Sequence, residues 1–231
     1  MPIETAWIYT FLPVAAAIMG AAVAAYRRPG PVVASAIQHF AAGVVFAAAA
    51  GEVLPRLKHR TSIWPIILGG GAGIIVMLLV EQLGARTERR TGLLTLVGVD
   101  MFIDGLVLGL GFIVSPKAGL LLTIALTLEV LFLGLSLAAK LGEEKMSRAQ
   151  TIGLTTAAIL LLPVGALAAS AVAQLSPAVL TGFFAFGLIA LLYLVTGELL
   201  VEAHETPDRP WVTALFFVGF LLLLILEEMI G

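Results

Sequence analysis

The chain has 231 residues, of which 60% are hydrophobic and only 12% are charged, and its formal net charge is −2. A soluble core of this length could not bury so much apolar surface, so the composition predicts a polytopic membrane protein. Cysteine is absent, which excludes disulfides and thiolate metal sites, and no basic or aromatic pattern indicates a nucleic-acid partner.

Apolar stretches separated by charged or Gly/Pro-rich breaks predict an all-α integral membrane protein, with the whole chain forming one transmembrane domain. We expect eight spans, at residues 6–26, 32–57, 62–83, 93–114, 119–140, 149–173, 178–202 and 210–229. The breaks between them are short, and residues 115–119 are expected to form a tight hairpin between the fourth and fifth spans.

The N-terminal segment has no Lys or Arg, unlike the basic start of a cleavable signal peptide, so the first span is expected to be retained. His39 lies near the start of the second span. We expect it to pack between helices as a hydrogen-bonded residue rather than to line the entrance of a transport path. The third span is rich in glycine, which favours close helix packing. Its last residues, including Glu81, are expected to meet water.

The fourth and fifth spans contain three carboxylates in two of the most apolar stretches of the chain: Asp100, Asp104 and Glu129. Each stretch is long enough to cross a bilayer core of ~30 Å as a helix. An ionised side chain at that depth costs roughly 2.5–3.5 kcal/mol, so it needs a partner, a proton or a cation. Asp100 and Asp104 share one helix face, and a bound cation would relieve their repulsion. The three side chains are therefore predicted to converge near mid-membrane.

Pro163 in the sixth span is expected to kink its helix, as is Pro55 in the second. A polar loop follows the seventh span, and it reads more naturally as a solvated loop than as a metal-capture site; it contains His204, Glu205 and Asp208. The eighth span ends in Glu227 and Glu228, which are expected to meet water.

Most Lys and Arg near span ends lie in the loops after the first, third, fifth and seventh spans. The positive-inside rule therefore predicts that these loops are cytoplasmic and that both termini are extracytoplasmic. The expected location is a prokaryotic plasma (inner) membrane.

Two faint internal repeats are present. Asp100 with the following Gly105-Leu106 is echoed by Glu129 with Gly134-Leu135, which makes the fourth and fifth spans resemble copies of opposite direction. Likewise, Gly51-Glu52 near the end of the second span is echoed by Gly197-Glu198 in the seventh. Inverted repeats with polar groups at the midplane are typical of secondary transporters. The two glutamates could serve either as gate ligands or as interfacial residues.

These segments resemble the ZIP (Zrt/Irt-like) divalent-metal transporters. DMFIDGLVLG (100–109) is similar to the family signature HNFxEGxxxG of helix four, and LEVLFLGLSLA (128–138) to a degraded HNIPEGLAxA of helix five. AAGVVFAAAAGEVLP (41–55) and residues 197–200 resemble the family's helices two and seven. The resemblance implies a divergent prokaryotic-type member with eight helices in an inverted-repeat 3+2+3 bundle and with both termini outside.

Carried over position by position, the resemblance puts the family's helix-four His, Asn and Glu on Asp100, Met101 and Asp104. It puts the helix-five His on Glu129 and the helix-five Glu on Leu133. The helix-six Glu of the family falls on Leu162. The resemblance thus implies one acidic cation site, with the second metal site of the family lost.

An all-carboxylate set is hard and oxygen-rich, so it suits Mn²⁺, Mg²⁺, Ca²⁺ or Fe²⁺ better than an imidazole or thiolate site does. We expect a divalent ion (Zn²⁺, Mn²⁺, Fe²⁺ or another) as transported substrate and no cofactor. Met101 offers a soft thioether, although core packing is the commoner role of methionine. The candidate metal ligands are Asp100, Asp104, Glu129, Met101, Glu52 and Glu198.

The expected function is a secondary transporter of divalent metal, with membrane lipid as its other partner and a homodimer left open. The first alternative is a transporter of the same fold that has lost metal specificity and moves protons or another small solute, since Leu133 and Leu162 replace acidic positions. An intramembrane enzyme ranks last and none is expected, because an aspartic dyad needs carboxylates facing each other from separate elements.

Overall fold

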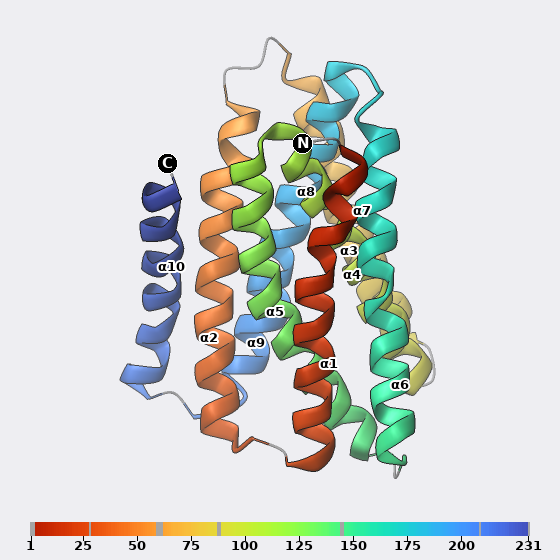
Figure 1. Cartoon of the computed structure of the whole chain (residues 1–231), viewed down its shortest axis with the longest axis vertical. Coiled ribbons are helices and arrows are strands. Elements are labelled where there is room, and N and C mark those ends of the chain that lie inside the picture. Colours follow the sequence, from red (N-terminus) through yellow and green to blue (C-terminus); the bar gives the residue numbers. More distant parts are fainter. Residues whose placement is uncertain are drawn as a thin grey trace.

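The computed structural model describes residues 3–27, 29–58, 62–86, 89–143, 146–207 and 209–230, and these residues form helices joined by short turns (Figure 1). The elements are η1 (Ile3–Thr10), α1 (Phe11–Tyr26), α2 (Pro31–Ala48), η2 (Ala49–Val53), η3 (Leu54–Leu57), α3 (Trp64–Arg86), α4 (Arg89–Val114), α5 (Pro116–Glu143), α6 (Arg148–Ile159), α7 (Leu161–Val172), α8 (Pro177–Tyr193), η4 (Leu194–Leu199), α9 (Leu200–Ala203) and α10 (Pro210–Ile230).

Within the described residues, eight helical stretches are long and apolar enough to cross a membrane, as expected of an integral membrane protein. Their ends agree with the predicted spans to within three residues. The predicted hairpin at residues 115–119 is wrong in its extent, because α5 already begins at Pro116 and only Ser115 separates it from α4. Proline is favoured in the first turn of a helix, where its missing N–H has no helical partner to lose.

Proline residues explain two interruptions in these spans. The sixth span is broken at Leu160, between α6 and α7, because the Pro163 ring would collide with the carbonyl of Ile159 four residues earlier. The predicted kink at Pro163 is thus confirmed. In the second span, Pro55 lies four residues after Gly51, and the helix changes there from α to the π-helical η2 and the 3₁₀-helical η3.

Glycine residues bring helix pairs into backbone contact on both sides of the central α4–α5 pair. A Cβ atom added at Gly134 of α5 would collide with the backbone of Ala17 in α1. In the same way, Gly165 of α7 lies against the carbonyl of Phe102 in α4, and Gly105 of α4 lies against the carbonyl of Leu162. The helices α1–α5 and α4–α7 are therefore tightly packed pairs, as predicted for small residues in membrane helices.

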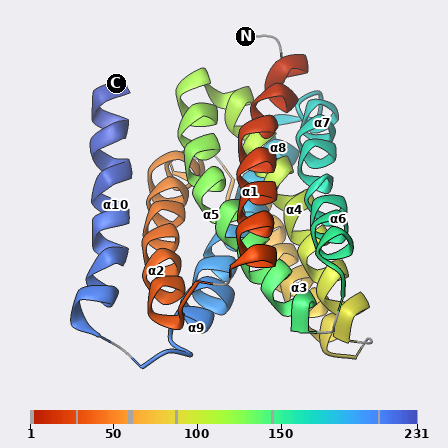
Figure 2. The same cartoon turned by 60° about the horizontal axis from the view of Figure 1, so that its bottom comes forward.

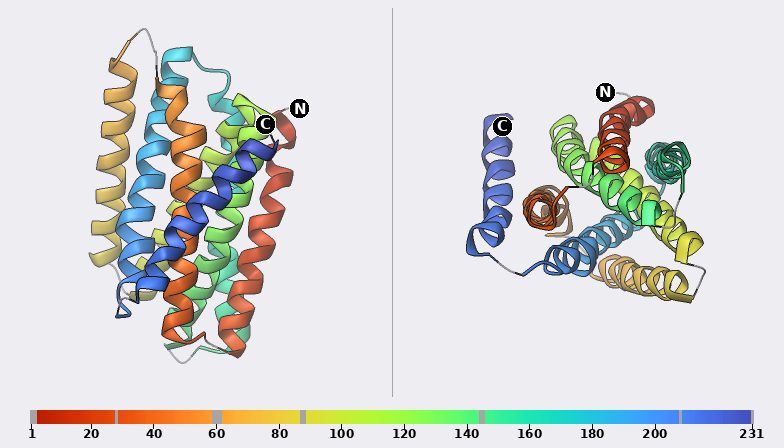
Figure 3. Two further views of the ribbon diagram at one scale, coloured as in Figure 1. Left: turned by 90° about the vertical axis from the view of Figure 1, so that its left-hand side faces the viewer. Right: turned by 90° about the horizontal axis from the view of Figure 1, so that it is seen from below.

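Two further pairs complete the bundle. Gly43 of α2 and Gly219 of α10 allow these two helices to touch, and Gly69 of α3 lies against Gly182 of α8. Figure 2 shows α10 beside α2 at the edge of the bundle, and the view from below in Figure 3 shows α3 beside α8.

The helices alternate in direction along the chain, so the N- and C-terminal elements end on the same side of the bundle (Figures 1 and 3). We call this side the terminal end. The opposite side, the far end, carries the last residues of α1, α3, α5 and α9 together with the first residues of α2, α4, α6 and α10.

Candidate cation site

The carboxylates predicted from the sequence meet between α4 and α5. One oxygen atom from each of Asp100, Asp104 and Glu129 lies within 4.8 Å of the others, and this group is the carboxylate trio of the text below. The three side chains are 5%, 2% and 1% exposed. The predicted convergence is therefore confirmed, and it places acidic oxygens from two helices around one point inside the bundle.

Four of the six carboxylate oxygens of the trio are buried without a hydrogen-bond partner. They are Asp100 Oδ2, Asp104 Oδ2 and both carboxylate oxygens of Glu129. One oxygen of Asp104 and one of Glu129 lie within 4.8 Å of each other, but two deprotonated carboxylates offer no donor. A buried charge without a partner is strongly unfavourable, so the arrangement calls for a cation or a shared proton between the oxygens.

The immediate surroundings of the trio are apolar. Met101 is completely buried in the hydrophobic core, where its side chain packs as the commoner role of methionine predicts. Leu162, at the position of the family's helix-six Glu, is also completely buried. Leu133, at the position of the helix-five Glu, is half-buried and packs against the same core.

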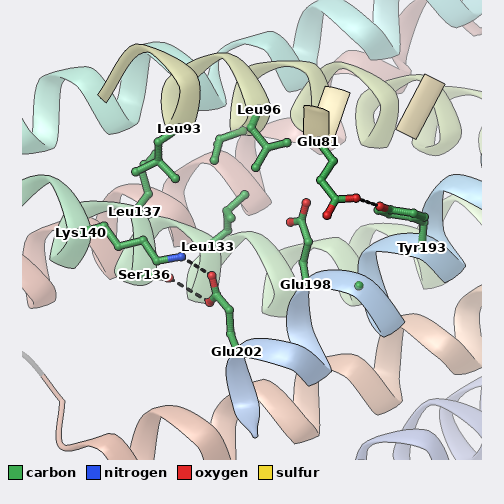
Figure 4. A pocket seen from close by; sticks show the side chains of 12 residues that line it. Glu81, Leu93, Leu96, Leu133, Ser136, Leu137, Lys140, Tyr193, Glu198 and Glu202 are labelled. Carbon is green, nitrogen blue, oxygen red and sulfur yellow. Dashed lines mark hydrogen bonds and ion pairs between the residues drawn. The ribbon is translucent and has the colours of Figure 1, made fainter. Parts of the chain in front are cut away.

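A cavity of about 220 Å³ lies on the far-end side of the trio (Figure 4). Val97 and Leu133 line it, one helical turn from Asp100 and Glu129 respectively, so they stand between the cavity and the trio. Its polar lining comes from the far ends of α3, α5, α8, η4 and α9, and consists of Glu81, Ser136, Lys140, Tyr193, Glu198 and Glu202.

The polar groups of this cavity are partly paired with one another. Lys140 forms an ion pair with Glu202, whose carboxylate also accepts hydrogen bonds from Ser136 at 3.1 Å and from Gln38 at 2.8 Å. The Tyr193 hydroxyl donates to Glu81 (Figure 4). Three carboxylates facing one ammonium group leave the cavity acidic, which favours the entry of cations.

Glu198 connects the cavity with the trio. Its side chain lines the cavity, and its carboxylate interacts electrostatically with Asp100, Asp104 and Glu129. It lies in η4, a π-helical segment, and such segments are frequent at functional sites. Of the two repeated glutamates, Glu198 is thus the one close to the trio on the far-end side.

Glu52 lies on the other side of the trio, in the π-helical η2 near the terminal end. It is buried, and it interacts electrostatically with Glu227 of α10 and with Arg56 and Lys117. The cavity that it lines has only about 10 Å³, close to the space of one water molecule. Of these two cavities, the larger therefore lies on the far-end side of the trio and the smaller beside Glu52.

Two residues expected to meet water also have partners within the protein. Glu81, although exposed, lines the cavity and accepts the Tyr193 hydrogen bond, and Glu227 is half-buried against Gly51. Lys140 and Glu202 were not predictable as cavity residues from the sequence, because charged residues at span ends resemble ordinary interfacial residues. Asp208, part of the predicted polar loop, lies outside the described residues.

Comparison with known proteins adds no family assignment: no protein-family model matches this chain, and no curated protein shows significant similarity to it.

Proposed function

We propose that this protein is a carrier of divalent cations and that the carboxylate trio is its transport site. The observation that carries the proposal is the convergence of three buried carboxylates, four of whose six oxygens lack a hydrogen-bond partner. A divalent ion supplies positive charge to all three at once, which a single hydrogen bond cannot do. The ion is the transported substrate.

The chemistry of the ligands favours hard cations. Carboxylate oxygens are the ligands that Mn²⁺, Mg²⁺ and Ca²⁺ prefer, whereas borderline Zn²⁺ gains more from imidazole nitrogen. Three carboxylates around one divalent ion leave an excess negative charge, so protonation of one carboxylate would favour release of the ion.

The two ends of the bundle suit alternating access. The acidic cavity at the far end gives an ion a route as far as Val97 and Leu133, with Glu198 as the next carboxylate after the trio. At the terminal end, Glu52 occupies the corresponding place beside a cavity that holds no more than one water. We take Glu198 and Glu52 as the inner and outer gate ligands.

The packing of helix pairs supports an inverted-repeat 3+2+3 arrangement. Exchanging the first three spans with the last three, and α4 with α5, converts the α1–α5 pair into the α7–α4 pair. The same exchange converts α2–α10 into α8–α3. The π-helical segments that carry Glu52 and Glu198 also correspond, and they lie towards opposite ends of the bundle.

This arrangement agrees with the resemblance of the chain to ZIP transporters, from which it departs at Leu133 and Leu162. We therefore propose a ZIP-like carrier with one cation site. The basic loops at the far end favour a cytoplasmic location for that end in a prokaryotic plasma membrane, and so an inward-open conformation.

A second candidate is a proton carrier. The closeness of Asp104 to Glu129 favours it, because two neighbouring buried carboxyl groups can share one proton. Such a carrier would need no metal ion in the trio.

Metal-dependent thermal stability of the purified protein separates the two candidates. A ligand that binds only the folded state adds about 2.7 kcal/mol of stability at a concentration 100 times its Kd. We expect Mn²⁺ to raise the melting temperature of the wild-type protein, and we expect the near-isosteric variants Asp104→Asn and Glu129→Gln to lose this increase.

Glu228→Gln serves as the matched control, since it removes an exposed carboxylate at the end of α10. Its response to Mn²⁺ should equal that of the wild type. If both trio variants keep the full response to Mn²⁺, the transport site lies elsewhere, and if no divalent ion stabilises the wild type, the proton carrier is favoured.

A further inference from the structure

A lysine lies on the same face of α5 as Glu129 of the trio. Glu129, Leu133, Ser136 and Lys140 follow one another at spacings of four, three and four residues, which places them on one side of the helix. The last three of them line the far-end cavity of about 220 Å³. Lys140 is therefore about three helical turns from the trio, near the end of α5.

The carboxylate that pairs with Lys140 is also held in place by other groups. The Lys140 ammonium group contacts Oε1 of Glu202, whereas Oε2 accepts hydrogen bonds from Ser136 at 3.1 Å and from Gln38 of α2 at 2.8 Å. These two bonds orient the carboxylate independently of Lys140, so Oε1 stays directed towards the ammonium position (Figure 4). A cation that replaces the ammonium group would therefore meet an oriented oxygen ligand.

The ion pair separates the far-end cavity from a second cavity. The second cavity has about 250 Å³ and lies between α2, α5 and α9, and Ser136, Lys140 and Glu202 line both cavities. The side chain of Lys140 is 43% exposed, and a lysine ammonium group is carried on a flexible four-carbon stem. The second cavity thus gives the ammonium group room to move away from Glu202 when another cation takes its place.

The charge of Lys140 also acts on the next carboxylate towards the trio. The Glu198 carboxylate interacts electrostatically with both Lys140 and Glu202. Among the described residues that line the far-end cavity, Lys140 is the one with a positive charge, and it faces the carboxylates of Glu81, Glu198 and Glu202. Without this ammonium group, the three carboxylates would hold a divalent ion in the cavity more tightly.

We propose that Lys140 is a tethered counter-ion that determines how tightly the far-end cavity holds the transported ion. Its ammonium group occupies Glu202, a carboxylate between the trio and the far end, and a divalent ion must displace it to bind there. This competition prevents retention of the ion in the cavity, so the ion moves on to the trio or leaves at the far end. The role rests on the proposed function, in which the ion passes through this cavity.

Calorimetric titration of the purified protein with Mn²⁺ tests this role in the Asp104→Asn background, in which the trio no longer binds the ion. We expect Asp104→Asn/Lys140→Gln to bind Mn²⁺ at least about tenfold more tightly than Asp104→Asn alone, because a repelling charge has been removed from the cavity. Lys140→Met should give the same gain, and adding Glu202→Gln should abolish it. A purely structural role of the ion pair predicts the opposite, since a distorted cavity binds an ion less well.

Two further variants in the same background serve as controls. Lys140→Arg keeps the positive charge and should bind Mn²⁺ as weakly as Asp104→Asn alone. Lys58→Gln removes an exposed lysine that lines neither cavity, and it should also leave Mn²⁺ binding unchanged.

The absence of a gain in Lys140→Gln and Lys140→Met, or an equal gain in Lys140→Arg or Lys58→Gln, would overturn the role of Lys140. Failure of the proposed function gives a different result, namely equal binding of Mn²⁺ by the wild type and by Asp104→Asn. A gain in Lys140→Gln that accompanies this result would contradict the trio as transport site and still support the competition at Glu202.

Discussion

At the scale of single residues, the proposed selectivity depends on which atoms surround the ion. The trio offers only oxygen, because Asp100 and Glu129 stand where the resemblance to ZIP transporters implies histidine. Nearby Leu133 and Leu162 add no ligand. The ion is therefore held mainly by negative charge, which favours hard cations over those that gain from nitrogen.

Replacing Asp100 and Glu129 together by His should shift the preference of the protein from Mn²⁺ towards Zn²⁺. Two imidazoles strengthen the binding of Zn²⁺, while Mn²⁺ loses oxygen ligands and negative charge. Competition between the two ions for uptake into vesicles measures the change. With both proteins active, an unchanged Zn²⁺-to-Mn²⁺ ratio would mean that these two positions do not contact the transported ion.

The trio could be predicted from the sequence because a carboxylate inside an apolar span is conspicuous and costly. The residues that line the far-end cavity could not be predicted in this way. Glu81, Lys140 and Glu202 occur at the ends of three different spans, where charged residues are ordinary. Only the packing of α3, α5 and α9 shows that these side chains face one another.

At the scale of elements, backbone contact between helices positions the trio. Gly165 of α7 lies against the Phe102 carbonyl, which is within two residues of both aspartates of α4. A side chain at that point would push α4 away from α7. The site therefore depends on a glycine that supplies no ligand.

Gly165→Ala should destabilise the protein by about 1–3 kcal/mol or more, since the added methyl group overlaps with the backbone. It should also weaken the stabilisation by Mn²⁺, because α4 carries two of the three carboxylates. The melting temperature with and without Mn²⁺ measures both effects.

Gly153→Ala is the control within the same span, because nothing lies within 4 Å of a Cβ added there. Its stability should be unchanged or slightly higher, as Ala favours a helix over Gly by about 1 kcal/mol. Equal melting temperatures for the two variants would contradict the close α4–α7 contact.

The spans themselves could be predicted closely, since their length and apolar composition are set by the bilayer. The prolines also allowed the break before Pro163 to be expected. The π-helical form of η4 could not be predicted, because no proline marks it and the sequence Leu194–Leu199 is compatible with an ordinary α-helix. The pairs of helices that touch at glycine residues could not be predicted either, since a glycine in the sequence does not indicate which helix packs against it.

At the scale of the whole molecule, the bundle is asymmetric although its helix pairs correspond. The far end has a cavity of about 220 Å³ beside the trio, and the terminal end has one of about 10 Å³. In an alternating-access carrier, such a difference is expected of the state in which the ion site is accessible from one side of the membrane, here the far end.

Because the chain has no cysteine, single introduced cysteines report this asymmetry directly. Leu96→Cys lines the far-end cavity and should react with a membrane-impermeant thiol reagent added on that side of the membrane. Leu110→Cys, at a position only 1% exposed beside the small cavity, should be protected from both sides. Rapid labelling of Leu110→Cys, or protection of Leu96→Cys, would contradict the conformation described.

The central claim is that the trio binds the transported ion, and uptake of Mn²⁺ into liposomes that contain the purified protein tests it most directly. We predict uptake by the wild type and by Glu228→Gln, and uptake by Asp104→Asn and Glu129→Gln that falls to the rate of protein-free liposomes. Wild-type uptake by folded Asp104→Asn and Glu129→Gln would contradict the claim.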